Sequence, residues 1–171
     1  ARCPVGGTPL RSKGRRMNED QARDWAVQRF GEDVAARIDW FLDRVVVEND
    51  QQNLIAPSTI GTIWGRHAVD SAQLIPLAER TAGQWIDIGT GGGFPGMIVA
   101  IAWPGRVALV EPRKRRAEFL QECVDGLGMA DRVTVHASKI EAVPLKADII
   151  SARAVATVEN LLRAGLHCGK Q

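Results

Sequence analysis

Apolar residues recur every three or four positions between residues 18 and 78, a spacing typical of amphipathic helices. The first predicted helix begins after Asn18, which can serve as an N-cap, and ends at Gly31. The second is broken between residues 49 and 57, and a third helical stretch runs from about 58 to 78. Two glycines weaken the middle of the third stretch, which is therefore also compatible with two short helices. The apolar stripe of the second helix consists of Val34, Ile38, Phe41, Leu42, Val45 and Val46.

The pattern changes after residue 83. Short apolar runs, typical of buried strands, alternate there with helical stretches. The predicted strands are residues 84–88, 107–110, 132–136 and 147–150, and the predicted helices are residues 96–103, 114–127 and 155–166. Strands alternating with helices of this length predict an α/β fold, with a parallel, Rossmann-like sheet and right-handed crossovers.

The two patterns suggest three regions. Residues 1–16 form a flexible basic arm, residues 17–82 an N-terminal helical cap, and residues 83–171 the sheet domain. A sheet that stopped after four strands would leave an open edge strand, which proteins usually avoid. We therefore expect the C-terminal strands of this domain to be absent from the sequence.

Composition excludes several classes of protein. Apolar residues make up 45% and charged residues 25% of the chain, which are ordinary globular values. The three cysteines show no metal-ligand spacing, so we expect reduced thiols, no metal site and a cytoplasmic protein. We also expect a monomer. No apolar run is long enough to span a bilayer. The formal charge is only +2, but residues 1–16 carry five basic and no acidic residues, compatible with a plain arm or with RNA contact.

A glycine-rich turn follows the first predicted strand. Gly91, Gly93 and Gly96 match G-x-G-x-x-G between a strand and a helix, where a ligand can lie against the backbone. Glu111 ends the next strand twenty residues after Gly91, where a carboxylate can accept hydrogen bonds from both ribose hydroxyls. This arrangement suits both dinucleotides and S-adenosylmethionine.

Asp87 favours S-adenosylmethionine over a dinucleotide. It lies two residues before Gly89, at the end of the strand. A carboxylate there would repel a pyrophosphate, whereas it suits a ligand with an ammonium and a sulfonium group. The alternative is an aspartate that only makes the loop rigid.

Several stretches of this sequence resemble one family, the bacterial 16S ribosomal RNA guanine-N7 methyltransferases, also called glucose-inhibited division protein B. The His-x-x-Asp-Ser element and the Gly-Gly-Phe-Pro-Gly turn carry the most specific part of the resemblance. The matching stretches are Asn53-Leu54, Pro57-Ser58, Arg66 to Ser71, Asp87 to Gly96, Leu109 to Glu111, Phe119-Leu120, Ser138 to Glu141 and Ser151 to Ala154.

The resemblance implies a class I methyltransferase sheet with an N-terminal helical cap, S-adenosylmethionine as cofactor, and 16S ribosomal RNA or the small ribosomal subunit as partner. It also implies that Gly89 and Phe94 line the cofactor, that Ile140 and Glu141 border its adenine, and that Arg153 acts at the cofactor and target end as the catalytic residue. The family more often has arginine in place of Lys139, so we assign no role to that lysine.

Two groups of residues are candidates for the substrate side. His67 and Asp70 are one helical turn apart, so they either border the substrate cleft or form a hydrogen-bonded pair that ties the cap to the sheet. The basic run that contains Arg113, Arg115 and Arg116 opens a helix, where cations are unfavourable against the dipole, so phosphate contact would explain it better than stability does. A solvated basic face is the alternative.

Other functions remain open from the sequence. They are a methyltransferase that acts on a small molecule or a protein, a nicotinamide-dependent oxidoreductase, which Asp87 disfavours, and a binding module without catalytic activity.

Overall fold

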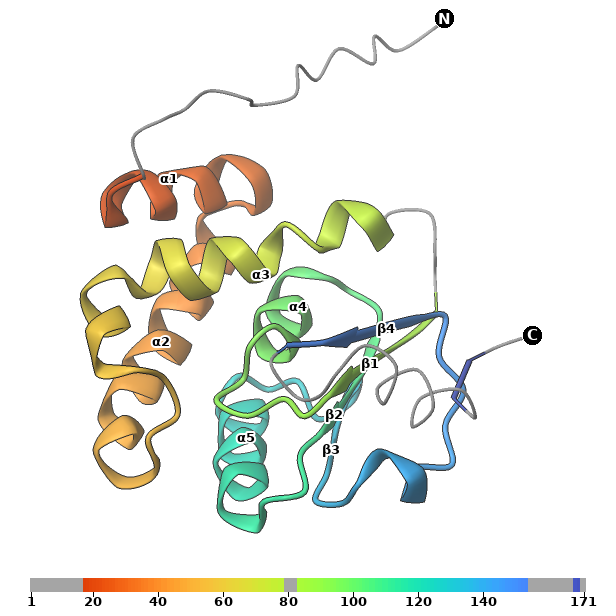
Figure 1. Ribbon diagram of the computed structural model, residues 1–171. Helices are drawn as coiled ribbons and strands as arrows, with labels where there is room; N and C mark the ends of the chain where they lie inside the picture. The colour runs from red at the N-terminus through yellow and green to blue at the C-terminus, as the bar shows by residue number, and fades with distance from the viewer. Residues whose placement is uncertain (1–16, 79–82, 154–167, 170–171) are drawn as a thin grey trace, which may run out of the picture.

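The computed structural model describes residues 17–78, 83–153 and 168–169. At its centre four parallel strands form a sheet in the order β3-β2-β1-β4 (Figure 1). The strands are β1 (Gln84–Ile88), β2 (Arg106–Val110), β3 (Val133–His136) and β4 (Ile149–Ala152). Because β1 pairs with both β2 and β4, the turn after β1 lies at the middle of the sheet. The predicted α/β fold with a parallel sheet is confirmed.

The fourth strand begins two residues later than the sequence pattern suggested. Ala147 forms an isolated parallel bridge with Gly169, and its N–H donates to the Cys168 carbonyl at 2.6 Å. Pairing with β1 in the strand register starts only at Ile149, opposite Trp85. The apolar run therefore serves two different partners, and only its second half belongs to β4. The helix predicted at residues 155–166 and the basic arm at 1–16 lie outside the described residues.

Each face of the sheet packs against a different layer. On one face lie α4 (Gly96–Ala102) and α5 (Lys114–Gly126), with the cap beyond them. The opposite face is covered by the segment that contains the short 3₁₀ helix η4 (Ile140–Ala142) and by Cys168. Strand residues alternate between the two apolar clusters, with Trp85, Val107 and Leu109 in the first and Ile86, Ile88, Ala108 and Val110 in the second.

The cap begins with two α-helices. Asn18 and Gln21 form a capping box at the start of α1 (Glu19–Phe30), as the N-cap prediction required. Helix α2 (Glu32–Gln52) packs on α4 and α5 and runs a turn beyond the predicted break. The reason is Asn49, whose buried side chain accepts a hydrogen bond from the Ile55 N–H at 2.8 Å. This residue fastens the following loop and does not end the helix.

The third helical stretch consists of four short pieces. They are the 3₁₀ helix η1 (Pro57–Thr62), the π-helical turn η2 (Trp64–Val69), the short α3 (Asp70–Ala72) and the 3₁₀ helix η3 (Ile75–Ala78). The Glu19 carboxylate accepts hydrogen bonds from the Trp64 N–H at 2.8 Å and the Gly65 N–H at 3.1 Å, so α1 fastens the first turn of η2. The wider π turn contains His67, a residue of the candidate site.

Within the described ranges, no helix is both long and apolar enough to cross a membrane. The same part of the chain brings together no group of three His, Cys, Asp or Glu side chains that could hold a metal ion. The side chains of Cys123 and Cys168 are buried.

Candidate functional site

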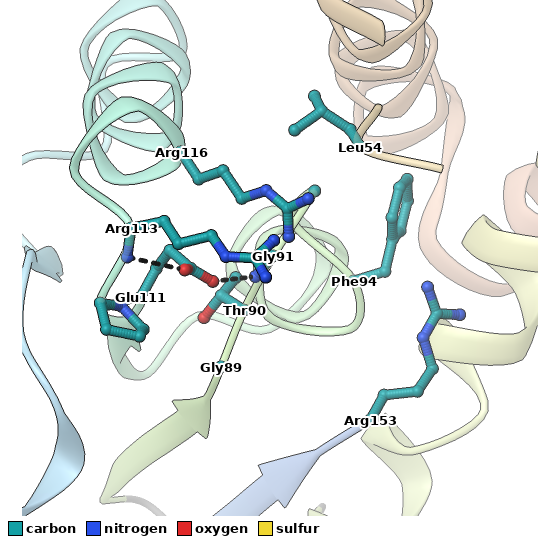
Figure 2. A pocket seen from close by; sticks show the side chains of 11 residues that line it. Leu54, Gly89, Thr90, Gly91, Phe94, Glu111, Arg113, Arg116 and Arg153 are labelled. Atoms are coloured by element: carbon teal, nitrogen blue, oxygen red, sulfur yellow. Dashed lines mark hydrogen bonds between the residues drawn. The ribbon is translucent and has the colours of Figure 1, made fainter. Parts of the chain in front are cut away.

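A pocket of about 350 Å³ opens at the carboxyl ends of β1, β2 and β4, between the sheet and the cap (Figure 2). Its volume falls within the roughly 300 to 1,000 Å³ usual for small-molecule sites. The carboxyl edge of a parallel sheet, beside the point where strand order reverses, is also where α/β proteins bind ligands. The lining residues are Leu54, Gly89, Thr90, Gly91, Gly92, Phe94, Glu111, Pro112, Arg113, Arg116 and Arg153.

Backbone hydrogen bonds shape the glycine-rich turn. The N–H groups of Gly89 and Thr90 both donate to the Val110 carbonyl, at 2.7 and 3.1 Å, which joins the turn to the end of β2. Gly91 (φ 60°) and Gly93 (φ 99°) have left-handed backbone conformations that favour glycine. Gly91 lines the pocket, whereas Gly93 is buried, and a Cβ atom there would collide with the Phe41 ring of the cap. Gly93 therefore serves packing of the cap and does not line the pocket.

Glu111 lies at the pocket wall, as the sequence predicted. Its side chain is almost entirely buried, and its two carboxylate oxygens accept hydrogen bonds from the Gly91 N–H at 2.8 Å and the Arg113 N–H at 2.9 Å. Each oxygen keeps further acceptor capacity, so the carboxylate can also accept hydrogen bonds from a ribose diol. The glycine turn, the anchored carboxylate and the pocket volume together fit S-adenosylmethionine.

Asp87 lies beneath the turn and does not line the pocket. Its oxygens accept hydrogen bonds from the Ser151 hydroxyl at 2.6 Å and the Gly96 N–H at 3.1 Å, and Ser151 in turn accepts from Trp85 Nε1 at 2.8 Å. Complete burial raises the pKa of Asp87 to about 6, against the effect of these hydrogen bonds. We expected the Asp87 carboxylate to face a bound cation. Instead it lies outside the pocket lining and joins β1 to β4 and to the start of α4.

Arg153 lies at the other end of the pocket, immediately after β4 (Figure 2). Its Nη2 donates to Nδ1 of His67 at 3.1 Å, and its guanidinium carbon is 5.4 Å from the centre of the Phe94 ring. Burial is the main cause that lowers the pKa of Arg153, while the carboxylates of Asp70 and Asp87 act in the opposite direction. The cation is thus held between the cap and the turn.

His67 and Asp70 are not joined as a pair. The side chain of His67 contacts Thr59 Oγ1 through Nε2 at 2.9 Å and Arg153 through Nδ1, and its ring packs 4.9 Å from that of Phe94. Asp70 lines a separate hollow of about 220 Å³ beside α1, together with Arg66. His67 does tie the cap to the sheet, as the second sequence-based interpretation held, but it does so through Arg153 and not through Asp70.

The basic run divides between two surfaces. Arg113 and Arg116 line the pocket, and Arg116 Nη2 donates to the Asn53 carbonyl of the cap at 3.4 Å. Arg115 lies in a shallow polar hollow beside α2, and Lys114 pairs with Glu118 at 3.7 Å. Only part of the run is therefore placed to contact a molecule in the pocket.

The segment after β3 does not border the pocket in the part of the chain that the structure describes. Ile140 is buried against the opposite face of the sheet, Glu141 is exposed beside it, and Lys139 precedes η4. The proposed place of Ile140 and Glu141 beside an adenine stays a prediction.

Sequence reasoning missed several residues of the site. Leu54 and Ser151 lie in stretches that carried the family resemblance, which was the available signal. The side chain of Thr59 had no such signal, because its contact with His67 depends on the turn between them. The missed pocket-lining residues are Leu54, Thr90, Gly92 and Pro112.

Comparisons with known proteins agree with this geometry. The family profile GidB, described as rRNA small subunit methyltransferase G, matches residues 35–171. Ribosomal RNA small subunit methyltransferase G from Rhizorhabdus wittichii is 44% identical over 149 residues, covering 85% of this chain and 69% of that protein. The protein of the same name from Zymomonas mobilis is 39% identical over 158 residues, covering 86% of this chain and 71% of its own length.

Solved structures support the fold. A putative O-methyltransferase from Klebsiella pneumoniae has a TM-score of 0.58 at 22% identity, covering 86% of this chain and 66% of its own. A putative S-adenosyl-L-methionine-dependent methyltransferase from Methanococcus maripaludis has a TM-score of 0.54 at 17% identity, covering 94% and 63%. These likenesses establish the class I methyltransferase fold, and the sequence matches establish the family. The chain belongs to the rRNA small subunit methyltransferase G family.

Proposed function

We propose that this chain transfers the methyl group of S-adenosylmethionine to N7 of a guanine in 16S ribosomal RNA. The observation that carries the proposal is the anchored Glu111 carboxylate beside Gly91 in a ligand-sized pocket, in a chain of this family. Family membership supports the choice of RNA and of guanine N7, whereas the pocket supports the choice of cofactor.

The two ends of the pocket suit different parts of the reactants. At one end, Glu111 accepts hydrogen bonds from the ribose hydroxyls, and the neighbouring Pro112 offers an apolar contact to a purine. At the other end, Arg153 donates to an acceptor oxygen, either the methionine carboxylate or O6 of guanine. It must leave N7 itself free, because that lone pair has to attack.

The proposed chemistry needs no general base. S-adenosylmethionine, when bound, would supply a sulfonium methyl group, and the N7 lone pair would form the new N–C bond as the C–S bond breaks. Guanine N7 carries no proton, so none has to be removed, and positive charge passes from sulfur to the purine. The work left to the side chains is positioning, the main source of rate in such transfers.

The basic residues around the pocket suit the RNA backbone. Arg113 and Arg116 line the pocket wall on the α5 side, while Arg115 lies outside the pocket, in the polar hollow beside α2. Contacts of this kind neutralise phosphates and orient an RNA without reading its sequence.

Two experiments test the proposed function. Calorimetry should show binding of S-adenosylhomocysteine and not of NAD, because a nicotinamide-dependent enzyme would give the reverse. Incubation with small-subunit RNA from a strain that lacks the N7 mark should then place one methyl group on one guanine. Cofactor binding without any methylation of that RNA, or of the 30S subunit, would overturn the choice of substrate.

A further inference from the structure

Hydrogen bonds connect Thr59 in the cap to His67, and His67 to Arg153 at the pocket. We propose that Thr59 and His67 form a directed hydrogen-bond chain that holds the Arg153 guanidinium in one orientation at the reacting end, with His67 acting as the neutral Nε2–H tautomer. The proposal deepens the proposed function and rests on it for the catalytic consequence, whereas the hydrogen-bond chain itself can be tested separately.

The direction of each hydrogen bond follows from the donors present. A guanidinium has only N–H donors, so Nδ1 of His67 must accept the hydrogen bond of 3.1 Å from Arg153 Nη2 and carries no proton. The Thr59 hydroxyl donates to the Ala56 carbonyl at 2.7 Å, which leaves only its lone pairs for His67. Nε2 of His67 must therefore carry the proton and donate to Thr59 Oγ1 at 2.9 Å. Both ends of the hydrogen-bond chain, Thr59 and Arg153, require the same tautomer of His67.

The surroundings of His67 favour its neutral form. Burial lowers the pKa of His67 to about 4, and the positive charges of Arg153 and Arg66 act in the same direction. Protonation of Nδ1 would place an N–H group against the guanidinium, with loss of the hydrogen bond and repulsion between two cations. His67 is therefore an acceptor for Arg153 throughout the neutral pH range.

The hydrogen-bond chain limits how Arg153 can move. Its guanidinium lies over Phe94, one hydrogen of Nη2 is used by His67, and the residue itself lines the pocket. A loose guanidinium beside the reacting guanine could donate to N7 and block the lone pair that must attack. A guanidinium held by His67 instead contacts only acceptors that lie in its fixed direction. Thr59 and His67 are thus positioning residues that act through Arg153.

Two substitutions of His67 separate the acceptor from the donor. His67→Asn keeps an oxygen acceptor near the place of Nδ1, while His67→Gln keeps an N–H donor near the place of Nε2 but loses the acceptor for Arg153. We expect kcat for RNA methylation to stay within about threefold of the wild type in His67→Asn and to fall at least about tenfold in His67→Gln. Thr59→Ser should leave kcat unchanged. Thr59→Val should lower kcat by roughly threefold, because the His67 ring loses the hydrogen bond to Thr59 Oγ1 that fixes its orientation.

Urea unfolding of each variant separates a loss of fold from a loss of positioning. If His67→Asn and His67→Gln lose the same activity while remaining folded, the positioning role is overturned. If the wild type methylates no RNA, the proposed function fails first, and that outcome is visible before any variant is compared.

Nitrogen NMR of the His67 ring tests the hydrogen-bond chain independently of catalysis. The sequence has three histidines, so comparison of the wild type with His67→Asn assigns the ring signals of His67. At pH 7 we expect an unprotonated Nδ1 and a protonated Nε2 in the wild type and also in Thr59→Val, because Arg153 alone still requires an accepting Nδ1. A protonated Nδ1 in the wild type, whether in the other tautomer or in imidazolium, would overturn the proposal whatever the enzyme does.

Discussion

The two ends of the pocket hold their charged side chains in different ways. Glu111 accepts hydrogen bonds from two backbone N–H groups, those of Gly91 and Arg113, which are close to it in the sheet domain. Arg153 is held by the side chains of His67 and Phe94, and His67 belongs to the cap. One end is therefore built by backbone groups beside the ends of β1 and β2, and the other by side chains from distant parts of the chain.

This difference sets how each end responds to change. Backbone donors lose no rotamer freedom when they bind a carboxylate, and no substitution other than proline removes them. The Arg153 end requires several ordered side chains and a docked cap. Asp87 connects the two ends, because it holds both the start of α4 and Ser151, two residues before Arg153. Substitutions at each place should therefore have distinct effects.

The largest expected effect is on cofactor binding at the Glu111 end. Glu111→Ala removes two hydrogen bonds between a charged group and the ribose, worth about 1.5–3 kcal/mol each. We expect the Kd for S-adenosylhomocysteine in calorimetry to rise at least about a hundredfold, at about 1.4 kcal/mol per tenfold. Glu118→Ala, on the surface of α5, is the control and should leave the Kd unchanged. A Kd within about threefold of the wild type in Glu111→Ala would remove this residue from the cofactor site.

Asp87 should make stability depend on pH. Its pKa is raised from 3.8 to about 6 in the folded chain, so between these values the folded state binds more protons than the unfolded state. The stabilisation is thus fully present below 3.8 and is lost as the pH rises through about 6. In Asp87→Asn this titration is absent. The free energy of unfolding of the wild type, relative to Asp87→Asn, should fall by up to about 3 kcal/mol between pH 4 and 7.

Urea unfolding of both proteins at several pH values measures this difference. Taking the difference between the two proteins cancels the titration of His67, whose depressed pKa has the opposite sign and weakens the fold as the pH falls below 6.5. A difference that does not vary with pH would show that Asp87 keeps an ordinary pKa in the folded chain.

At the Arg153 end the expected effect is on turnover. Arg153→Ala should lower the rate of RNA methylation at least about tenfold, because the positioned donor of the reacting end is lost. Arg153→Lys keeps the charge but loses the planar fork, so its rate should lie between those of the wild type and the alanine variant. Near-normal turnover of a folded Arg153→Ala enzyme would exclude this residue from the reacting end.

The smallest expected effect lies outside the pocket, on the basic surface of α5. Arg115→Gln should leave binding of S-adenosylhomocysteine unchanged, because Arg115 does not line the pocket. Its log–log dependence of RNA affinity on salt should be shallower by about 0.7–0.9 for one lost phosphate contact. An unchanged salt slope would indicate that Arg115 belongs to a solvated face.

The same contrast explains which features of the site were predictable from the sequence. The strand, the glycine turn and Glu111 follow from local hydrophobic spacing and backbone conformation, so their places were found correctly. Asp87 was recognised as important, but its burial depends on β4 and Ser151, which are far away in sequence. The late start of β4 likewise depends on the bridge between Ala147 and Gly169.

The cap shows the limit of helical periodicity. Periodicity correctly predicted helical structure between residues 58 and 78, but over so few turns it does not separate α, 3₁₀ and π geometry. The π turn orients His67 towards Thr59 and Arg153, and it is fastened by Glu19 of another helix. This orientation is a tertiary effect, so the sequence suggested Asp70 as the partner of His67 when the partner is Arg153.

By itself, the sequence determined the α/β order of elements, the glycine turn with its carboxylate, and the resemblance that led to the family. These features depend on residues within one strand–turn–helix unit, where side-chain alternation and glycine conformation are local properties. Only the tertiary structure decided that Asp87 lies under the turn, and that Thr59 and His67 hold Arg153 at the pocket. Buried polar groups take the hydrogen-bond partners that packing brings within reach, and packing joins residues that sequence spacing does not relate.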